Sequence, residues 1–279
     1  MARPDAGCYP AGPITEEGGR AAAMPALDIE LVPLLKDNYA YLLRDPAGGA
    51  TGVVDPSEAA PVLAAAAARG WRITHVLNTH HHWDHTGGNL EIKRATGCTV
   101  VGPAPDRDRV PGIDIAVDEG ERFGLGAAEA AIIFIPGHTR GHIAFWFEAS
   151  RALFCGDTLF ALGCGRLFEG TPAQMWSSLG KLRRLPGETR VFCGHEYTQA
   201  NARFARTVDP GNAALAARAE RIDALRAEGR PTIPSTMAEE CATNPFLRAD
   251  DPAIAAAVGL PATDPVAVFA EIRRRKDNF

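Results

Sequence analysis

The stretch THHHWDH at residues 79–85 places four histidines and an aspartate directly after an apolar run at residues 73–77. Such a run predicts a β-strand, and the polar stretch then lies at the end of that strand. Side chains of an extended chain alternate in direction, so His80 and His82, two residues apart, point the same way. We therefore expect these two imidazoles to share one metal ion.

The second half of the stretch is expected to serve a different ion. Asp84 and His85 fall where the chain bends toward a helix through residues 86–89, so their side chains face another direction. His81 points away from both groups and is given no ligand role. Two histidines and a carboxylate are too few for two closed metal sites, which predicts further ligands at other strand ends.

Three other apolar runs end in a glycine followed by a possible ligand, and these ligands are His138, Asp157 and His195. Glycine lets the backbone turn tightly beside an ion. A lone histidine is usually a surface or satisfied core residue, and His75 and His142 fit that description, although His142 lies close enough to support a ligand. For the whole cluster, packing so many polar groups together without a metal would leave their burial uncompensated.

Composition limits the class of protein. The 279 residues can form one large domain or two ordinary ones, and 46% hydrophobic with 23% charged residues is typical of globular chains. With 29 basic and 34 acidic side chains, the general basic surface of a nucleic-acid-binding protein is missing. No window reaches the roughly 18–20 apolar residues of a membrane helix. Six cysteines without a CxxC pair suit reduced thiols. We therefore expect a cytoplasmic monomer without nucleic-acid or membrane partners.

The pattern divides the chain into three parts. Residues 1–24 lack the features of a signal or transit peptide and are interpreted as a disordered tail. Residues 25–196 carry short apolar runs that predict strands and two helices, and residues 197–279 change to helical periods. The expected strands are 28–34, 39–44, 51–55, 73–78, 98–101, 131–135, 142–147, 152–156 and 190–193, and the expected helices are 61–69, 171–185, 196–208, 213–228, 252–258 and 264–276. This order predicts an α/β layer architecture followed by a helical domain.

The ligand pattern resembles that of the metallo-β-lactamase superfamily. Within it, THHHWDH together with GDTLF at 156–160 and GHEYT at 194–198 is similar to the hydroxyacylglutathione hydrolase, or glyoxalase II, family over about residues 27–279. The resemblance implies an αββα sandwich with metals at one edge and a C-terminal helical domain. It also implies that one metal is held by His80, His82 and His138, that the other is held by Asp84, His85 and His195, and that Asp157 bridges them.

All seven implied ligands offer nitrogen or oxygen, so two divalent ions fit them, with zinc expected and iron or manganese as alternatives. Such ions lower the pKa of a bound water from about 15.7 to about 7, which would supply a bridging hydroxide as nucleophile beside Asp84 and Asp157. No GxSxG motif is present, and Cys155 and Cys193 lie in apolar runs, so no protein nucleophile is expected. Asp55 either orients a ligand histidine or is an ordinary turn aspartate before a proline.

The basic C-terminal end carries the expected substrate contacts. Arg273 and Lys276, spaced i and i+3 on the last helix, point the same way. Alone, such a run is more often a solvated helix end. The resemblance implies instead that both grip the glycine carboxylate of glutathione, and it implies substrate roles for Arg166, Phe168 and Tyr197. Some family members carry lysine and tyrosine where this chain has Arg166 and Phe168, so one hydroxyl is lost and slightly weaker binding is expected.

The implied reaction is hydrolysis of S-(2-hydroxyacyl)glutathione, typically S-D-lactoylglutathione, to glutathione and a 2-hydroxy acid such as D-lactate, which completes methylglyoxal detoxification. The alternatives are a persulfide dioxygenase, which is an iron oxidoreductase that needs a single metal and typically lacks the helical domain, and another hydrolase of the same fold. A metal-stabilised binding module without turnover is disfavoured, because structural metal sites are usually closed.

Overall fold

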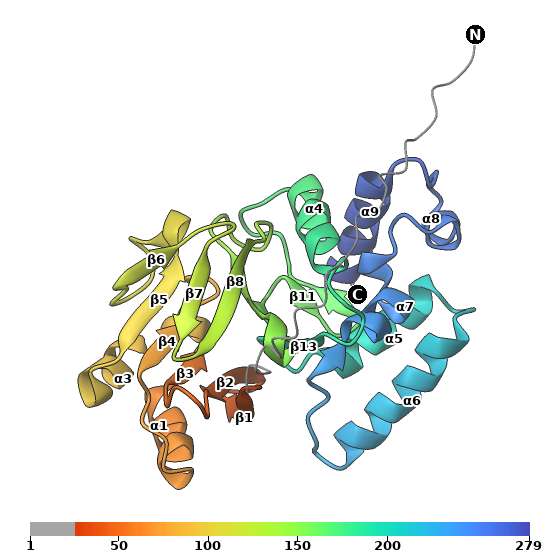
Figure 1. Cartoon of the computed structure of the whole chain (residues 1–279). Coiled ribbons are helices and arrows are strands. Elements are labelled where there is room, and N and C mark those ends of the chain that lie inside the picture. Colours follow the sequence, from red (N-terminus) through yellow and green to blue (C-terminus); the bar gives the residue numbers. More distant parts are fainter. Residues whose placement is uncertain (1–25) are drawn as a thin grey trace, which may run out of the picture.

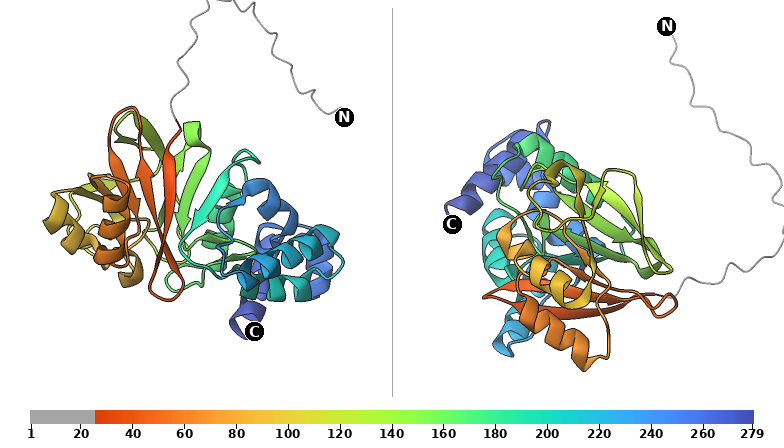
Figure 2. Two further views of the ribbon diagram at one scale, coloured as in Figure 1. Left: turned by 90° about the horizontal axis from the view of Figure 1, so that it is seen from below. Right: turned by 90° about the vertical axis from the view of Figure 1, so that its left-hand side faces the viewer.

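Two six-stranded sheets lie face to face in the computed structural model, which describes residues 26–279 (Figure 2). The first sheet contains, in spatial order, β1 (Asp28–Leu34), β2 (Asn38–Arg44), β3 (Thr51–Val54), β4 (His75–Leu77), β5 (Thr99–Pro103) and β6 (Ile115–Val117). The second contains β14 (Ser235–Thr236), β13 (Arg190–Cys193), β10 (Ala152–Gly156), β9 (Ile143–Phe147), β8 (Ala128–Phe134) and β7 (Arg122–Leu125). A separate hairpin pairs β11 (Leu159–Phe160) with β12 (Gly163–Cys164). The tail expected at residues 1–24 lies outside the described residues.

Aromatic and aliphatic side chains fill the space between the sheets. Strands β9 and β10 are buried at every position, and their sequences are accordingly continuous apolar runs without polar alternation. Tyr41 of the first sheet meets Phe154 and Phe192 of the second, with ring centroids 5.5 and 5.2 Å apart. Each large side chain buried in this way contributes about 1.5–3 kcal/mol. This core fixes the sheet edges from which the polar loops emerge.

Helices cover the sandwich from outside. On the first sheet lie α1 (Ala59–Ala68) and α3 (Asn89–Thr96), and Val62 and Ala66 of α1 pack against Val53 and Val76. Beside the second sheet lies α4 (Pro172–Leu182), between β8 and α9 (Pro265–Asp277) in Figure 1. Helix α4 begins with a capping box formed by Thr171 and Gln174. The order of layers is therefore helix, sheet, sheet, helix, which confirms the expected architecture.

The C-terminal helices gather at one end of the sandwich, where Figure 1 colours them cyan to blue. They are α5 (Thr198–Val208), α6 (Ala213–Ala227), α7 (Met237–Thr243), α8 (Pro252–Val258) and α9. Helix α9 buries Phe269, whose ring lies 6.3 Å from that of Trp176 on α4. This region also extends the second sheet, because β14 pairs antiparallel with β13. It is therefore not purely helical.

The main local error concerns the histidine stretch itself. Strand β4 ends at Leu77, residues 78–82 form a loop, and α2 (Trp83–Thr86) follows, so His80 and His82 do not lie on a strand. Helix α3 follows the bend expected at residues 86–89, but its bounds were not predicted because its only buried residues, Asn89 and Ile92, give no apolar stripe. The short elements β6, β7, β11, β12, β14 and α7 were also missed. Among residues 26–279, no helix has the length and apolarity needed to cross a membrane.

Candidate active site

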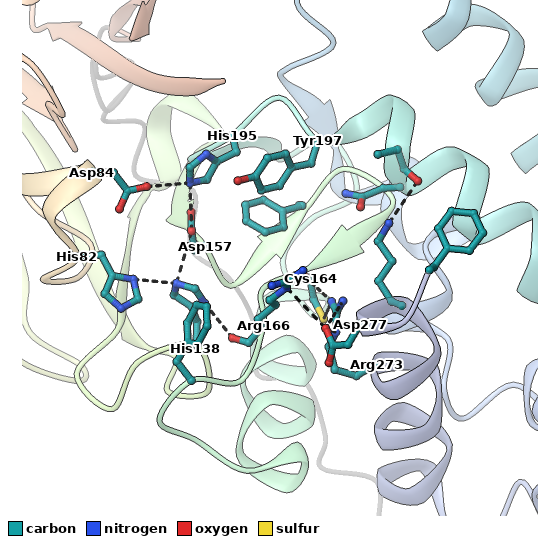
Figure 3. Close-up of a pocket in the computed structure, with 16 residues that line it drawn as sticks. His82, Asp84, His138, Asp157, Cys164, Arg166, His195, Tyr197, Arg273 and Asp277 are labelled. Carbon is teal, nitrogen blue, oxygen red and sulfur yellow. Dashed lines mark hydrogen bonds and ion pairs between the residues drawn. The ribbon is translucent and has the colours of Figure 1, made fainter. Parts of the chain in front are cut away.

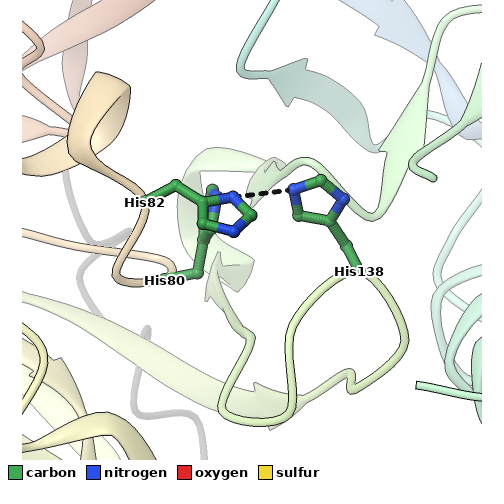
Figure 4. A group of neighbouring side chains, drawn as sticks. All are labelled: His80, His82 and His138. Carbon is green, nitrogen blue, oxygen red and sulfur yellow. Dashed lines mark hydrogen bonds between the residues drawn. The ribbon is translucent and has the colours of Figure 1, made fainter. Parts of the chain in front are cut away.

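Three histidines from two loops converge on one point. Ligand-capable atoms of His80, His82 and His138 all lie within 4.8 Å of one another. Nδ1 of His82 is 3.2 Å from Nε2 of His80 and 3.1 Å from Nε2 of His138 (Figure 4). The loop after β4 thus brings together the pair that was expected to share an ion, although its backbone is not extended throughout.

A second group lies beside the first and contains Asp84, His85 and His195, again with ligand-capable atoms within 4.8 Å of one another. Asp84 and His85 lie on α2, and His195 follows β13. Oδ2 of Asp84 is 3.5 Å from Nε2 of His195 and 3.6 Å from Nε2 of His85. The change of direction that separates the two halves of THHHWDH is therefore provided by the start of α2.

Asp157 lies between the two groups, as Figure 3 shows. Its Oδ2 is 3.5 Å from Nε2 of His138 and 3.2 Å from Nε2 of His195, and its Oδ1 is 3.5 Å from Nε2 of His85. The buried atoms His85 Nε2 and Asp157 Oδ1 have no hydrogen-bond partner within residues 26–279. Unpaired buried polar atoms are costly, and a shared cation would satisfy both. The seven side chains therefore fit divalent metal ions.

Two glycines are required by this close packing. Gly156, in the left-handed region at φ 47°, leaves no room for a Cβ, which would come within 2.9 Å of Cε1 of His142. A Cβ on Gly194 would lie 2.6 Å from Cε1 of His85. The pattern of strand, glycine and ligand thus has a steric cause, because the backbone approaches the neighbouring imidazoles directly.

Hydrogen bonds orient several of these side chains. Asp55 accepts from the Thr79 backbone N–H at 2.8 Å and faces Nδ1 of His85 at 3.2 Å, which supports the orienting role over that of a simple turn residue. His142 accepts from the backbone N–H of Asp157 at 3.1 Å, and its ring stacks on that of His80 at 4.5 Å. Because Asp55 also bonds the Thr79 hydroxyl, its carboxylate is fully used.

Two orienting residues were missed in the sequence. Asp37 faces Nδ1 of His195 at 2.9 Å, and Asn38 donates to Oδ2 of Asp84 at 3.2 Å. Asp37 is the last residue of the turn between β1 and β2 and Asn38 is the first residue of β2, far along the chain from His195. No local motif marks them, and only the polar pair Asp37-Asn38 within an apolar hairpin could have drawn attention.

The protonation states suit metal binding. Burial lowers the pKa of His82 to about 4 and lowers the pKa of His80 well below its usual value. Burial alone would raise the pKa of Asp157, but His195 and His85 hold it well below its usual range. Burial would likewise lower the pKa of His85, but Asp157 raises it well above normal. The upward shift of the His85 pKa reflects the buried negative charge of Asp157, which a bound cation would also neutralise.

A cavity of about 580 Å³ joins these groups to the C-terminal helix. The histidine and aspartate cluster forms one end, and Arg166, Arg273, Lys276, Asp277 and Phe279 line the other. Sequence reasoning missed Asp277 and Phe279. Asp277 could have been found from its i+4 spacing to Arg273, to which it is paired at 2.9 Å.

The basic residues differ in what they offer to a ligand. Arg273 is buried, donates to the Cys164 carbonyl at 2.8 Å and pairs with Asp277, so it holds the end of β12, from which the loop with Arg166 begins. Lys276 is half-buried, and burial together with nearby arginines lowers its pKa to about 8. Arg166 is largely exposed, with Nε 3.8 Å from Oδ1 of Asp277. The structure brings all three to the same cavity.

The two expected aromatic contacts lie nearer the histidines. Tyr197 stacks on His195 with centroids 4.7 Å apart, and burial raises the pKa of its hydroxyl, so it remains a donor at neutral pH. Phe168 is 63% exposed and presents its ring to the edges of His82 and His138 at 5.8 and 5.2 Å. Its exposed face is therefore available to a ligand.

Comparison with known proteins assigns the two halves of the chain to two family models. Residues 35–195 match the metallo-β-lactamase superfamily, and residues 196–279 match the C-terminus of hydroxyacylglutathione hydrolase. The chain is 66% identical over 253 residues to a hydroxyacylglutathione hydrolase of Methylococcus capsulatus, covering 91% of this chain and 99% of that protein. It is 61% identical over 256 residues to a hydroxyacylglutathione hydrolase of Rhodospirillum rubrum, and the match covers 92% of this chain and 100% of that protein. The crystal structure of ETHE1 from Myxococcus xanthus matches with a TM-score of 0.65 at 24% sequence identity, and the match covers 88% of this chain and 90% of that chain. At this identity the likeness shows a shared fold and nothing more.

Proposed function

This chain belongs to the hydroxyacylglutathione hydrolase family of the metallo-β-lactamase superfamily, and on that premise we propose that it hydrolyses S-(2-hydroxyacyl)glutathione. The proposed substrate is S-D-lactoylglutathione, and the products are glutathione and D-lactate, which completes methylglyoxal detoxification. The observation that carries the proposal is the single cavity with a histidine and aspartate cluster at one end and basic side chains at the other.

The proposed cofactors are two divalent ions, zinc in the first place and iron or manganese as alternatives. His80, His82 and His138 would hold one, Asp84, His85 and His195 the other, and Asp157 would contact both. When bound, such ions polarise the thioester carbonyl and lower the pKa of the attacking water. The support is the convergence of these donors and the unpaired buried atoms of His85 and Asp157.

The chain's own groups keep this centre ready for catalysis. Asp157 is proposed to stay ionised and to hold the two groups at a fixed separation, and Asp84 is steered by the amide of Asn38. Electrostatic groups fixed in advance cost no reorganisation during the reaction. The thiolate of glutathione is a good leaving group, so a strong general acid beside it is not required.

At the other end, we propose that Lys276 and Arg166 attract the carboxylates of glutathione, and that Arg273 contributes by shaping the loop that carries Arg166. Tyr197 supplies a hydroxyl donor, while Phe168 offers an apolar face in place of the tyrosine of some relatives. A carboxylate bound by a cation away from bulk water is held by a charge-assisted hydrogen bond.

The proposed domains are residues 25–196 for catalysis and 197–279 for substrate binding, with the change from sheet to helices as support. We further propose a cytoplasmic monomer. The five cysteines within residues 26–279 are free, as in a reducing compartment.

One preparation tests the proposal. Metal content is measured first, and hydrolysis of S-D-lactoylglutathione is then followed by thiol release beside oxygen uptake with glutathione persulfide. The expected result is two metal equivalents with thioester hydrolysis. One iron per chain with persulfide-dependent oxygen uptake would replace the hydrolase by a persulfide dioxygenase.

A further inference from the structure

The histidine without a ligand role, His81, lies in a charged network beside the active site. Its Nδ1 is 2.8 Å from Oδ2 of Asp106, which is 2% exposed. Its other ring nitrogen contacts the guanidinium of Arg109, and Arg109 in turn pairs with Oδ1 of Asp106 at 3.1 Å. His81 is therefore clamped from both sides, between the two neighbours expected to bind metal.

Arg109 extends this network to the loop that precedes α4. Its guanidinium makes two contacts with the carboxylate of Glu169, one at 3.1 Å to Oε2 and one to Oε1. Oε2 of Glu169 also accepts the backbone N–H of Arg140 at 2.8 Å. The Arg109 guanidinium is the main cause that lowers the pKa of Glu169 to about 2, so Glu169 is ionised throughout the working range.

The segment that ends at Glu169 touches the candidate metal centre at several points. The carbonyl of Arg166 faces Nδ1 of His138 at 2.9 Å, and the ring of Phe168 lies against His82 and His138. Next to Glu169, the N–H of Gly170 donates to the carbonyl of Gly137 at 3.0 Å. Residues 166–170 thus lie between the cavity on one side and the loop of His138 on the other.

We propose that Arg109 and Glu169 are positioning residues that hold the substrate-facing segment 166–170 against the loops carrying His82 and His138. Neither side chain lines the cavity, so both act through the residues they hold. The network joins three loops: 79–82 through His81, 136–141 through the Arg140 backbone, and 166–170 through Glu169. This inference rests on the proposed function for the identity of the metal centre.

Loss of the Arg109–Glu169 contact should affect one of the two proposed metal ions and not the other. His82 and His138 belong to the first ligand group, whereas Asp84, His85 and His195 are oriented by Asp37, Asn38 and Asp55. Residues that orient metal ligands typically change metal affinity by about 10- to 100-fold when removed. Loss of the Arg109–Glu169 contact should therefore weaken one of two zinc equivalents and leave the second near its original affinity.

The experiment uses the full chain and Zn²⁺ as the probe. Metal-free wild type, Arg109→Met, Glu169→Gln and the double variant are titrated with zinc against a chromophoric chelator, and KM and kcat for S-D-lactoylglutathione are measured on the reloaded proteins. Arg122→Met is the matched control, because it removes an exposed arginine–glutamate pair of 2.7 Å on β7 and β8. Thermal unfolding reports any general loss of stability.

We expect Arg109→Met to weaken one zinc equivalent by about 10-fold or more and to raise KM, while the control stays at the wild-type values. The double variant should lose less than the sum of the two single variants, because both changes break the Arg109–Glu169 contact, although Arg109→Met also removes the contacts to His81 and Asp106. Wild-type zinc affinity and KM in Arg109→Met, or equal weakening of both equivalents with a matching loss of thermal stability, would overturn the proposal. Failure of the wild type to hydrolyse the thioester would reject the proposed function instead, and the zinc titration would still report on the network.

Discussion

Lys276 lies one helical turn from Arg273 on α9, half-buried against the rings of Phe204 and Phe279 at 5.2 and 5.3 Å. We predict that Lys276→Ala raises KM for S-D-lactoylglutathione much more than it lowers kcat. The reason is that a contact with a remote carboxylate is equally strong in the bound substrate and in the transition state. One charge-assisted hydrogen bond contributes about 1.5–3 kcal/mol, which corresponds to an increase in KM of about 10- to 140-fold.

The pH dependence of kcat/KM provides a second test of the role of Lys276. Burial, with help from Arg273, Arg203 and Arg166, lowers the pKa of Lys276 to about 8. The ammonium form that attracts a carboxylate is present below this pH and is lost as the pH rises through it. Consequently kcat/KM of the wild type should fall above a pH of about 8, toward the level of Lys276→Ala. In Lys276→Arg this fall should disappear, because guanidinium keeps its charge to a pH of about 12.

The measurement is the steady-state rate of the wild type, Lys276→Ala and Lys276→Arg across the pH range. A small thioester without a carboxylate serves as the control substrate, and its KM should not respond to the substitution. The carboxylate contact is wrong if Lys276→Ala lowers kcat at unchanged KM, or if the control substrate suffers equally. A fall above pH 8 that persists in Lys276→Arg belongs to another group.

Four further outcomes are expected. Asp157→Asn should lower kcat by about 100-fold or more with the circular dichroism spectrum retained; unchanged turnover with reduced thermal stability would make the metals purely structural. Asp55→Ala, which removes the bonds to Thr79 and His85, should weaken metal binding by about 10- to 100-fold in a chelator competition, and wild-type affinity would deny its orienting role. Arg218→Met removes the ion-pair partner of the fully buried Glu240, so urea unfolding should show a loss of about 3–5 kcal/mol, whereas a loss below 1 kcal/mol would contradict this. Removal of metal should lower Tm, since each ion at a thousand times its Kd contributes about 4 kcal/mol, and an unchanged Tm would mean that the folded state gains nothing from the ions.

The sequence allowed the converging histidines and aspartates to be predicted as metal ligands because these residues carry local marks. His138, Asp157 and His195 each follow a glycine at the end of an apolar run, and the structure explains this through the close approach of backbone to imidazole at Gly156 and Gly194. The convergence survived an error in secondary structure, since the loop after β4 still directs His80 and His82 to one point. The directions in which the side chains of His80 and His82 point were therefore easier to predict than the backbone hydrogen bonds that define the strand.

The orienting residues could not be predicted in the same way. Asp37 meets His195 across 158 positions of sequence, because the first hairpin lies beside the end of β13. Arg109 and Glu169 are 60 positions apart and sit in segments with ordinary surface composition. Which residues meet in such pairs depends on how the two sheets stack, and this stacking depends on the entire core. A single sequence carries no periodic signal for such pairs.

The free-energy cost of burying the histidine and aspartate cluster is an argument that the cluster binds a cation. Imidazoles are packed at ring distances of 4.2 to 5.2 Å around His80, and burial disfavours the protonated form of His80 itself. The same folded core must therefore offset an unfavourable gathering of like polar groups. A divalent ion reverses that balance, because each neutral imidazole and each ionised carboxylate then gains a partner, and binding free energy becomes folding free energy.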